Sequence, residues 1–99
     1  MKIEHNLDEG IFQTEVNGYK ASVKFTVANG SLDIRKTIVP KEIGGRGIAP
    51  ALVKEAYDYA QHQNLRCLAT CSYAVTWLAR HPEYNGMPSP DYVEGACAL

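Results

Sequence analysis

The most constraining feature of this sequence is the stretch from Tyr19 to Val27, in which apolar and polar side chains alternate without interruption. Alternation with a period of two predicts a strand that buries one face. Asn17-Gly18 precedes this stretch and Asn29-Gly30 follows it, and Asn-Gly is a strong signal for a tight hairpin turn. We therefore predict an antiparallel meander in which the stretch pairs with residues 11–16 and 32–39.

The N-terminal residues 3–6 are expected to extend the first strand of this meander. Beyond the third strand, apolar residues recur at helical spacing and predict a long helix over residues 47–63. Pro50 fits this helix because proline is tolerated in the first turn. Residues 65–71 return to a period of two, and a strand reached through a helical crossover should lie parallel to the third strand.

A second, shorter helix is predicted over residues 72–80, with Ser72 as its N-cap and His81-Pro82 as its stop. The expected fold is therefore α+β, with a mixed sheet of three antiparallel strands plus one parallel strand, one long helix and one short helix. Residues 85–99 carry glycine and proline with little periodicity, so we expect one domain over residues 1–84 followed by a loose C-terminal tail.

Composition excludes several classes of function. The formal net charge of -1 gives no basic surface for a nucleic acid. Residues 1–6 are too polar for a signal peptide, and no apolar run approaches the roughly 20 residues that span a bilayer. The odd count of 3 cysteines favours reduced thiols over a disulfide framework. We expect a cytoplasmic protein without a membrane partner.

The loop Gly44-Gly45-Arg46-Gly47 lies between the third strand and the long helix, where backbone amides and the helix dipole favour a phosphate. A P-loop is excluded because Ile48-Ala49 stand where lysine and serine or threonine are needed. A dinucleotide fingerprint fits poorly because Pro50 replaces its third glycine and the chain is too short for the full sheet. A third interpretation, in which the loop is a tight turn that binds no ligand, remains possible.

The stretch "IVPKEIGGRGIAPALV", residues 38–53, resembles the acyl-CoA-binding motif of the GNAT superfamily of N-acetyltransferases, a Q/R-x-x-G-x-G/A loop between a strand and a helix. The first position departs from the motif, since it is Gly44 here. The stretch "LRCLATCSYAVTWLARHPEY", residues 65–84, is similar to a subgroup of very small members of this family. The resemblance implies a minimal GNAT fold and an acetyl-CoA-dependent acyltransferase, or a CoA-binding module without transferase activity.

The resemblance also implies roles for individual residues. The pyrophosphate of CoA would lie against the amides of Gly45, Arg46, Gly47, Ile48 and Ala49. The pantetheine arm would pair with the backbone of Ile38 and Val39, where the third and fourth strands splay apart. The thioester would then lie near Cys71. The segments that shape the acceptor site in longer family members are missing, so the acceptor amine is not implied and the site is either open in a monomer or completed in a homodimer.

Cys71 has two interpretations, a small buried residue at the end of a strand or a nucleophile, because a thiol before a helix N-terminus has a lowered pKa. Cys67 is expected in the core, and a metal site made of Cys67, Cys71 and His62 would lack a convincing fourth ligand. His81 is read as a helix-closing residue or a proton carrier. Tyr73 and Trp77 are read as core or as a wall of the pantetheine site. Neither Asp33 nor Glu42 is well placed as a general base. Tyr84 could be a packing residue or an acid, and Cys97 has no assigned role.

Overall fold

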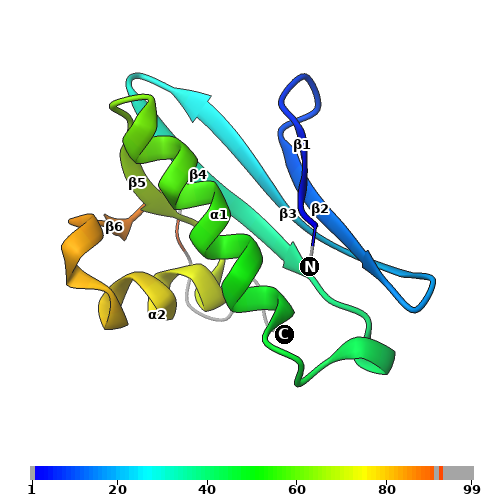
Figure 1. The fold of residues 1–99 in the computed structure, drawn as a ribbon. Coiled ribbons are helices and arrows are strands. Elements are labelled where there is room, and N and C mark those ends of the chain that lie inside the picture. Colours follow the sequence, from blue (N-terminus) through cyan, green and yellow to red (C-terminus); the bar gives the residue numbers. More distant parts are fainter. Residues whose placement is uncertain (1, 91, 93–99) are drawn as a thin grey trace.

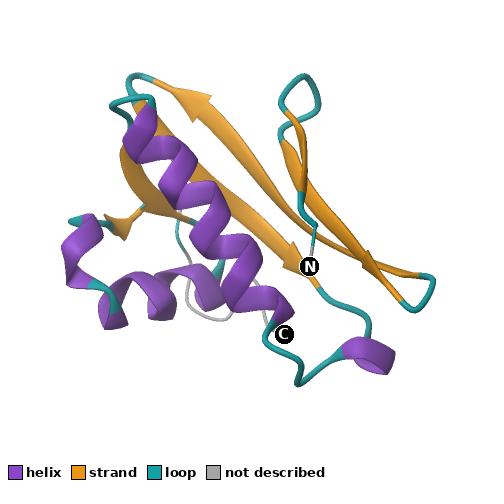
Figure 2. Cartoon of the chain, in the orientation of Figure 1, coloured by secondary structure: helices purple, strands orange, loops and turns teal. Residues whose placement is uncertain are grey.

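The computed structural model describes residues 2–90 and 92. One mixed sheet carries both helices, with the strands in the order β1-β2-β3-β4-β5-β6 and the long helix α1 lying across one face (Figure 1). Neither described helix is long and apolar enough to cross a membrane. The strands and helices, shown by type in Figure 2, are β1 (Glu4–Asn6), β2 (Ile11–Val16), β3 (Tyr19–Ala28), β4 (Ser31–Ile38), α1 (Ile48–His62), β5 (Arg66–Ala69), α2 (Ser72–Arg80) and β6 (Met87–Pro88).

The predicted meander is confirmed. β2, β3 and β4 pair antiparallel in sequence order, with Val16 opposite Tyr19 at the first Asn-Gly turn and Ala28 opposite Ser31 at the second. α1 then returns the chain so that β5 pairs parallel to β4, with Leu32 opposite Cys67. The predicted fold class is therefore confirmed, and so is the predicted strand that follows the long helix and lies parallel to the last strand of the meander.

The sheet has six strands, so the expectation of four is wrong at both edges. β1 does not extend β2, because the chain turns at residues 7–10 and β1 pairs antiparallel with β2, with His5 opposite Phe12. At the other edge β6, within the segment expected to be a loose tail, pairs parallel to β5 through Leu68 and Met87. Both edge strands are short and lack an alternating pattern, which is why periodicity did not reveal them as separate strands. Cys97 lies outside the described residues.

The core lies between the sheet and the two helices. Phe12, Val23 and Ile34 on the sheet and Leu52 and Val53 on α1 are all fully buried. Burying side chains of this size contributes about 1.5–3 kcal/mol each, which fixes α1 against the strands. The helix therefore holds the loop that precedes it at the end of β4.

Candidate functional site

β4 and β5 separate part of the way along their length. Their pairing ends where Ile34 lies opposite Ala69, whereas β4 continues to Ile38. The amides of Thr70 and Cys71 both donate to the carbonyl of Ile34, at 2.9 and 3.1 Å, as the chain turns toward α2. On the side that faced β5, residues 36–38 consequently have no strand partner among the described residues.

A β-bulge coincides with this separation. Lys24 lies opposite Lys36 and Phe25 lies opposite Ile34, so Arg35 is an extra residue in β4. A bulge bends its strand and increases the local twist. The end of β4 is therefore turned away from β5, as the splay of the two strands requires.

The glycine loop connects β4 to α1 and is anchored by the 3₁₀ turn η1 (Lys41–Ile43), whose Ile43 is fully buried. Gly47 is the N-cap of α1 with φ 74°, and the first turn of the helix holds no acidic residue and no side-chain cap. The first amides of a helix have no intrahelical partner, so those of Ile48 and Ala49 are available to an anion. Pro50 offers no amide.

A cavity of about 470 Å³ opens at this loop. Five of the residues that the sequence indicated for CoA line it, namely Val39, Gly45, Gly47, Ile48 and Ala49. Arg46 is an exposed residue of the same loop, and Ile38 lies on the strand just before it, 37% exposed. Gly44, Pro50, Tyr73, Ile43 and Lys41 complete the lining. Sequence reasoning missed Lys41, although a cation three residues before the glycines was a usable signal.

Tyr73 borders this cavity from the first turn of α2. Burial raises the pKa of its phenol, and the charge of Arg80 opposes that rise only in part. The phenol therefore keeps its proton at neutral pH and can donate a hydrogen bond to a ligand. Whether Tyr73 is a wall of a pantetheine site stays a prediction.

Cys71 lies beside the splay and is fully buried. Its thiol donates to Oγ1 of Thr37 on β4 at 3.4 Å. The expectation that Ser72 caps α2 is wrong, because Cys71 has the extended N-cap backbone and its carbonyl accepts the amide of Val75 at 2.9 Å. Ser72 is instead the first residue of the helix, and its buried Oγ has no hydrogen-bond partner.

The other candidate residues take structural positions. Cys67 is 2% exposed, and burial, with the nearby charge of Asp58, raises its pKa to about 11, so it is a core thiol as expected. His81 is the C-cap of α2, and its Nδ1–H donates to the carbonyl of Trp77 at 2.8 Å. Within residues 2–90 and 92, no group of three potential ligands could hold a metal ion.

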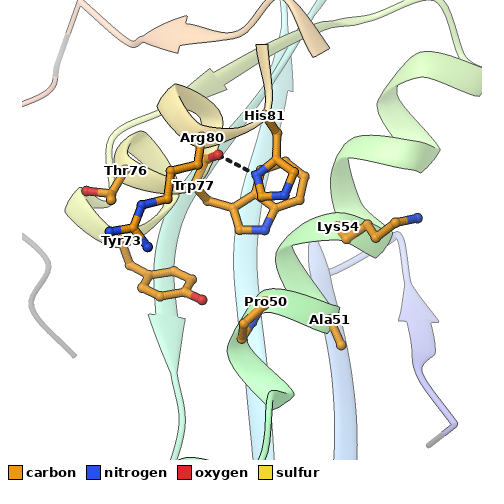
Figure 3. Close-up of a pocket in the computed structure, with 8 residues that line it drawn as sticks. All are labelled: Pro50, Ala51, Lys54, Tyr73, Thr76, Trp77, Arg80 and His81. Carbon is orange, nitrogen blue, oxygen red and sulfur yellow. Dashed lines mark hydrogen bonds between the residues drawn. The ribbon is translucent and has the colours of Figure 1, made fainter. Parts of the chain in front are cut away.

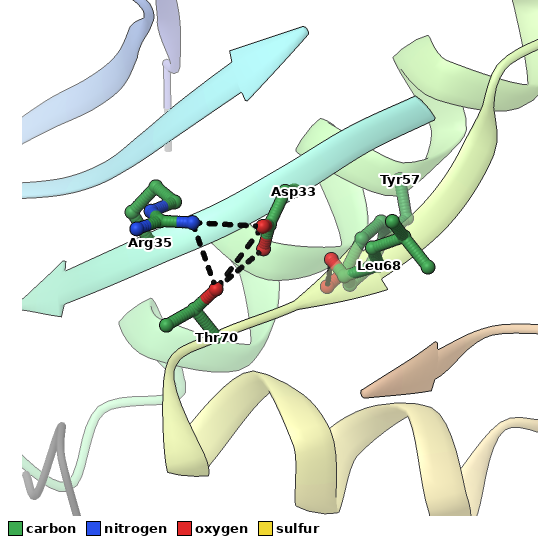
Figure 4. Close-up of polar contacts among 5 residues, drawn as sticks. All are labelled: Asp33, Arg35, Tyr57, Leu68 and Thr70. Carbon is green, nitrogen blue, oxygen red and sulfur yellow. Dashed lines mark hydrogen bonds and ion pairs between the residues drawn. The ribbon is translucent and has the colours of Figure 1, made fainter. Parts of the chain in front are cut away.

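A polar cluster sits at the base of the splay, on the face of β4 opposite that of the core residues Leu32 and Ile34 (Figure 4). The carboxylate of Asp33 accepts hydrogen bonds from Thr70 Oγ1 at 3.0 and 3.1 Å and from Arg35 at 3.1 Å. Asp33 is only 8% exposed. Its oxygens thus join β4 to the segment that follows β5.

The fold and the loop match known proteins. The profile of the GCN5-related N-acetyl-transferase family matches residues 11–87. Protein NATD1 from Xenopus tropicalis is 29% identical over 95% of this chain and 84% of its own length, and Protein NATD1 from Bos taurus is 30% identical over 95% and 80%. The solution structure of a "GCN5-like putative N-acetyltransferase" from Staphylococcus aureus has a TM-score of 0.67 and 26% identity, covering 96% of this chain and 92% of that one. The loop, the splay and these likenesses agree, and the chain belongs to the GCN5-related N-acetyltransferase family.

Proposed function

We propose that this protein transfers an acetyl group from acetyl-CoA to an acceptor amine. The observation that carries the proposal is the cavity at the glycine loop, which adjoins both the end of β4 and the N-terminus of α1. A ligand with an anionic middle and an amide-rich arm matches these two surfaces. The family of the chain supports the same ligand, since members of the GNAT superfamily use acetyl-CoA.

The residues of the cavity fit the pyrophosphate of CoA. Its oxygens would accept from the amides of Gly45, Arg46, Gly47, Ile48 and Ala49, and the positive end of the α1 dipole favours them. The absence of an acidic side chain in the first turn of α1 leaves that field unopposed. Lys41 adds a cation to the same cavity.

The pantetheine arm would lie along the end of β4. Beyond Ile34 this edge no longer pairs with β5, so the backbone of Ile38 and Val39 can pair with the amides of the arm. Tyr73, on α2, lines the same cavity and would pack against the arm. The reactive end of the arm would then point toward the splay beside Cys71.

We further propose that Cys71 can accept the acetyl group before the amine does. The Cys71 thiol would lose its proton as its sulfur attacks the thioester carbonyl carbon; the carbon–sulfur bond to CoA would break, and the leaving CoA sulfur would take up that proton. Cys71 lies at the N-cap of α2, beside the splay, and exchange of one thioester for another is close to neutral in energy. Because Cys71 is fully buried, this route requires the contact between its thiol and Thr37 to open.

Calorimetry with CoA tests the binding proposal, for which we expect a micromolar dissociation constant, about −8 kcal/mol at 1 μM. Gly47→Glu should abolish binding, since it places bulk and negative charge at the helix N-terminus. Gly47→Gln is the matched control of the same size and backbone strain, and it should bind at least about tenfold more tightly than Gly47→Glu. Tighter binding of NAD than of CoA would contradict the proposal.

Release of free thiol from acetyl-CoA, screened against amino acids, polyamines, aminoglycosides and peptide amines, tests transfer. Binding of CoA without turnover on any amine would favour a CoA-binding module. Intact mass after incubation with acetyl-CoA tests the covalent route, with one acetyl group expected on Cys71 and none in Cys71→Ala. Cys67→Ala should keep the label, and full transfer activity in Cys71→Ala would exclude the covalent step.

A further inference from the structure

The face of the sheet turned away from the core, which we call the outer face, carries a pair of lysines beside the splay. Both helices, and the cavity that they line together (Figure 3), lie on the core side of the sheet. Thr37 points to the core side, where it contacts Cys71, so its neighbour Lys36 points to the outer face. Lys24 lies directly opposite Lys36 in the pairing of β3 with β4, and both side chains are exposed. The outer face therefore presents two cations where β4 has separated from β5.

This pairing of two lysines is unfavourable for the fold. Like charges directly opposite each other on neighbouring strands repel and destabilise a sheet. On its other side Lys24 lies opposite Ile11, and neither lysine makes an ion pair with another residue in the described part of the chain. The carboxylate of Asp33, also on the outer face, is already engaged by Arg35 and Thr70. Positions where a sequence breaks such a local preference are expected at functional sites.

The outer face is the side from which an acceptor can reach the splay. With the pantetheine arm paired to the free edge of β4, as the proposed function has it, the thioester lies between the two strands beside Cys71. On the core side, the buried side chains of Thr37 and Cys71 fill this position. The acceptor amine would then approach from the outer face, where Lys36 borders the free edge of β4.

We infer that the acceptor carries a carboxylate near its amine, and that Lys24 and Lys36 together bind this carboxylate. The inference rests on the proposed function and names the chemical class of its acceptor. A carboxylate between two ammonium groups relieves their repulsion and accepts charge-assisted hydrogen bonds from both. Small acidic amines and acidic peptides share this chemistry, and they are distinguished by testing one pair of acceptors for each.

Rates of CoA release from acetyl-CoA with acceptors that differ only in a carboxylate test this inference. One pair is the α-amide of glutamate with that of glutamine; the other is an amidated peptide that begins with two glutamates with one that begins with two glutamines. The wild type should show a KM about three- to tenfold lower for the acidic member, and salt should reduce the difference. A preference in the first pair alone identifies a small amine as the acceptor, and one in the second pair alone identifies a peptide.

Substitution of the two lysines tests their role. Lys24→Gln and Lys36→Gln should each reduce the preference by raising the KM of the acidic member alone. Lys20→Gln is the matched control and should keep the preference, since Lys20 lies on the same face of β3 but opposite Glu15. Lys36→Gln should unfold at a temperature equal to or above that of the wild type, because it removes the repulsion with Lys24.

Equal KM values for the two members of each pair, or turnover confined to amines without a carboxylate, would overturn the inference and leave the proposed function standing. An equal rise in KM for both members in Lys36→Gln, a lower unfolding temperature of this variant, or loss of the preference in Lys20→Gln would overturn it as well. Turnover of no amine at all would overturn the proposed transfer and this inference together.

Discussion

The two halves of β4 belong to one continuous strand, but they differ in how many strands pair with them. Residues 31–34 are paired on both sides, with β3 and β5, and residues 36–38 are paired with β3 alone. The first half holds Leu32 and Ile34, both fully buried, whereas Ile38 in the second half is 37% exposed. One strand thus divides into a part that stabilises the fold and a part whose edge is free for a ligand, with the bulge at Arg35 as the boundary.

The largest effect should come from the paired half. Ile34→Ala removes a fully buried side chain and should lower the free energy of unfolding by about 2–5 kcal/mol, measured by urea denaturation. Ile38→Ala is the same substitution on the same strand and should change stability by less than about 0.5 kcal/mol. Equal losses for the two variants would mean that the two halves of β4 do not differ in the way described.

In the part of the sheet where β4 and β5 are paired, one side-chain hydrogen bond also connects β5 to α1. Tyr57 O–H donates to the carbonyl of Leu68 on β5 at 2.7 Å, and burial raises the pKa of Tyr57 well above its ordinary value (Figure 4). Tyr57→Phe leaves that carbonyl without its partner and should cost about 1–3 kcal/mol in thermal or urea unfolding. Tyr59→Phe, two positions along the helix, removes a hydroxyl for which the described residues show no hydrogen bond and should be nearly neutral.

Two glycines, in the turn before β4 and in the loop between η1 and α1, should separate an effect on stability from an effect on binding. Gly30 and Gly45 both have φ of +75°, and a Cβ at either position would meet nothing within 4 Å. Alanine at each should therefore cost a similar amount, about 1–2 kcal/mol of backbone strain. Only Gly45→Ala should also weaken CoA binding in calorimetry, because only Gly45 lines the cavity. A matching loss of affinity in Gly30→Ala would contradict this division.

The smallest effect concerns pH. Burial would raise the pKa of Asp58, but hydrogen bonds from Lys54 and Tyr84 outweigh it and hold that pKa below its ordinary value. A lowered carboxyl pKa stabilises the fold above the unfolded value, near pH 4, and the contribution is lost as the pH falls through the folded value. The side chain is 37% exposed, so solvent screening keeps this contribution small.

Unfolding of wild type and Asp58→Asn measured from pH 7 down to pH 3 checks this expectation. The stability difference between them should shrink as the pH falls below about 4. Tyr84→Phe, which removes one of the two hydrogen bonds, should show a weaker dependence over the same range. Parallel curves for all three proteins would show that Asp58 is not stabilised in the folded state.

Local sequence patterns predicted most of the fold. Alternation from Tyr19 to Val27 and the two Asn-Gly pairs identified the meander, and the change to helical spacing located α1 to within one residue at each end. They did not reveal that β1 is a strand separate from β2, nor did they reveal β6, because strands of 3 and 2 residues are too short for a period. The helix cap was misplaced because serine is the commoner cap, and the backbone of Cys71 took that position instead.

The sequence by itself determined the order of the elements and the glycine loop, since turn residues and hydrophobic period act over a few neighbouring positions. Tertiary structure decided what those elements enclose. The bulge at Arg35, the burial of Cys71 against Thr37, and the cavity that α1 and α2 line together each depend on residues far apart in the chain. Such contacts follow from how the helices pack on the sheet, and no local pattern encodes them.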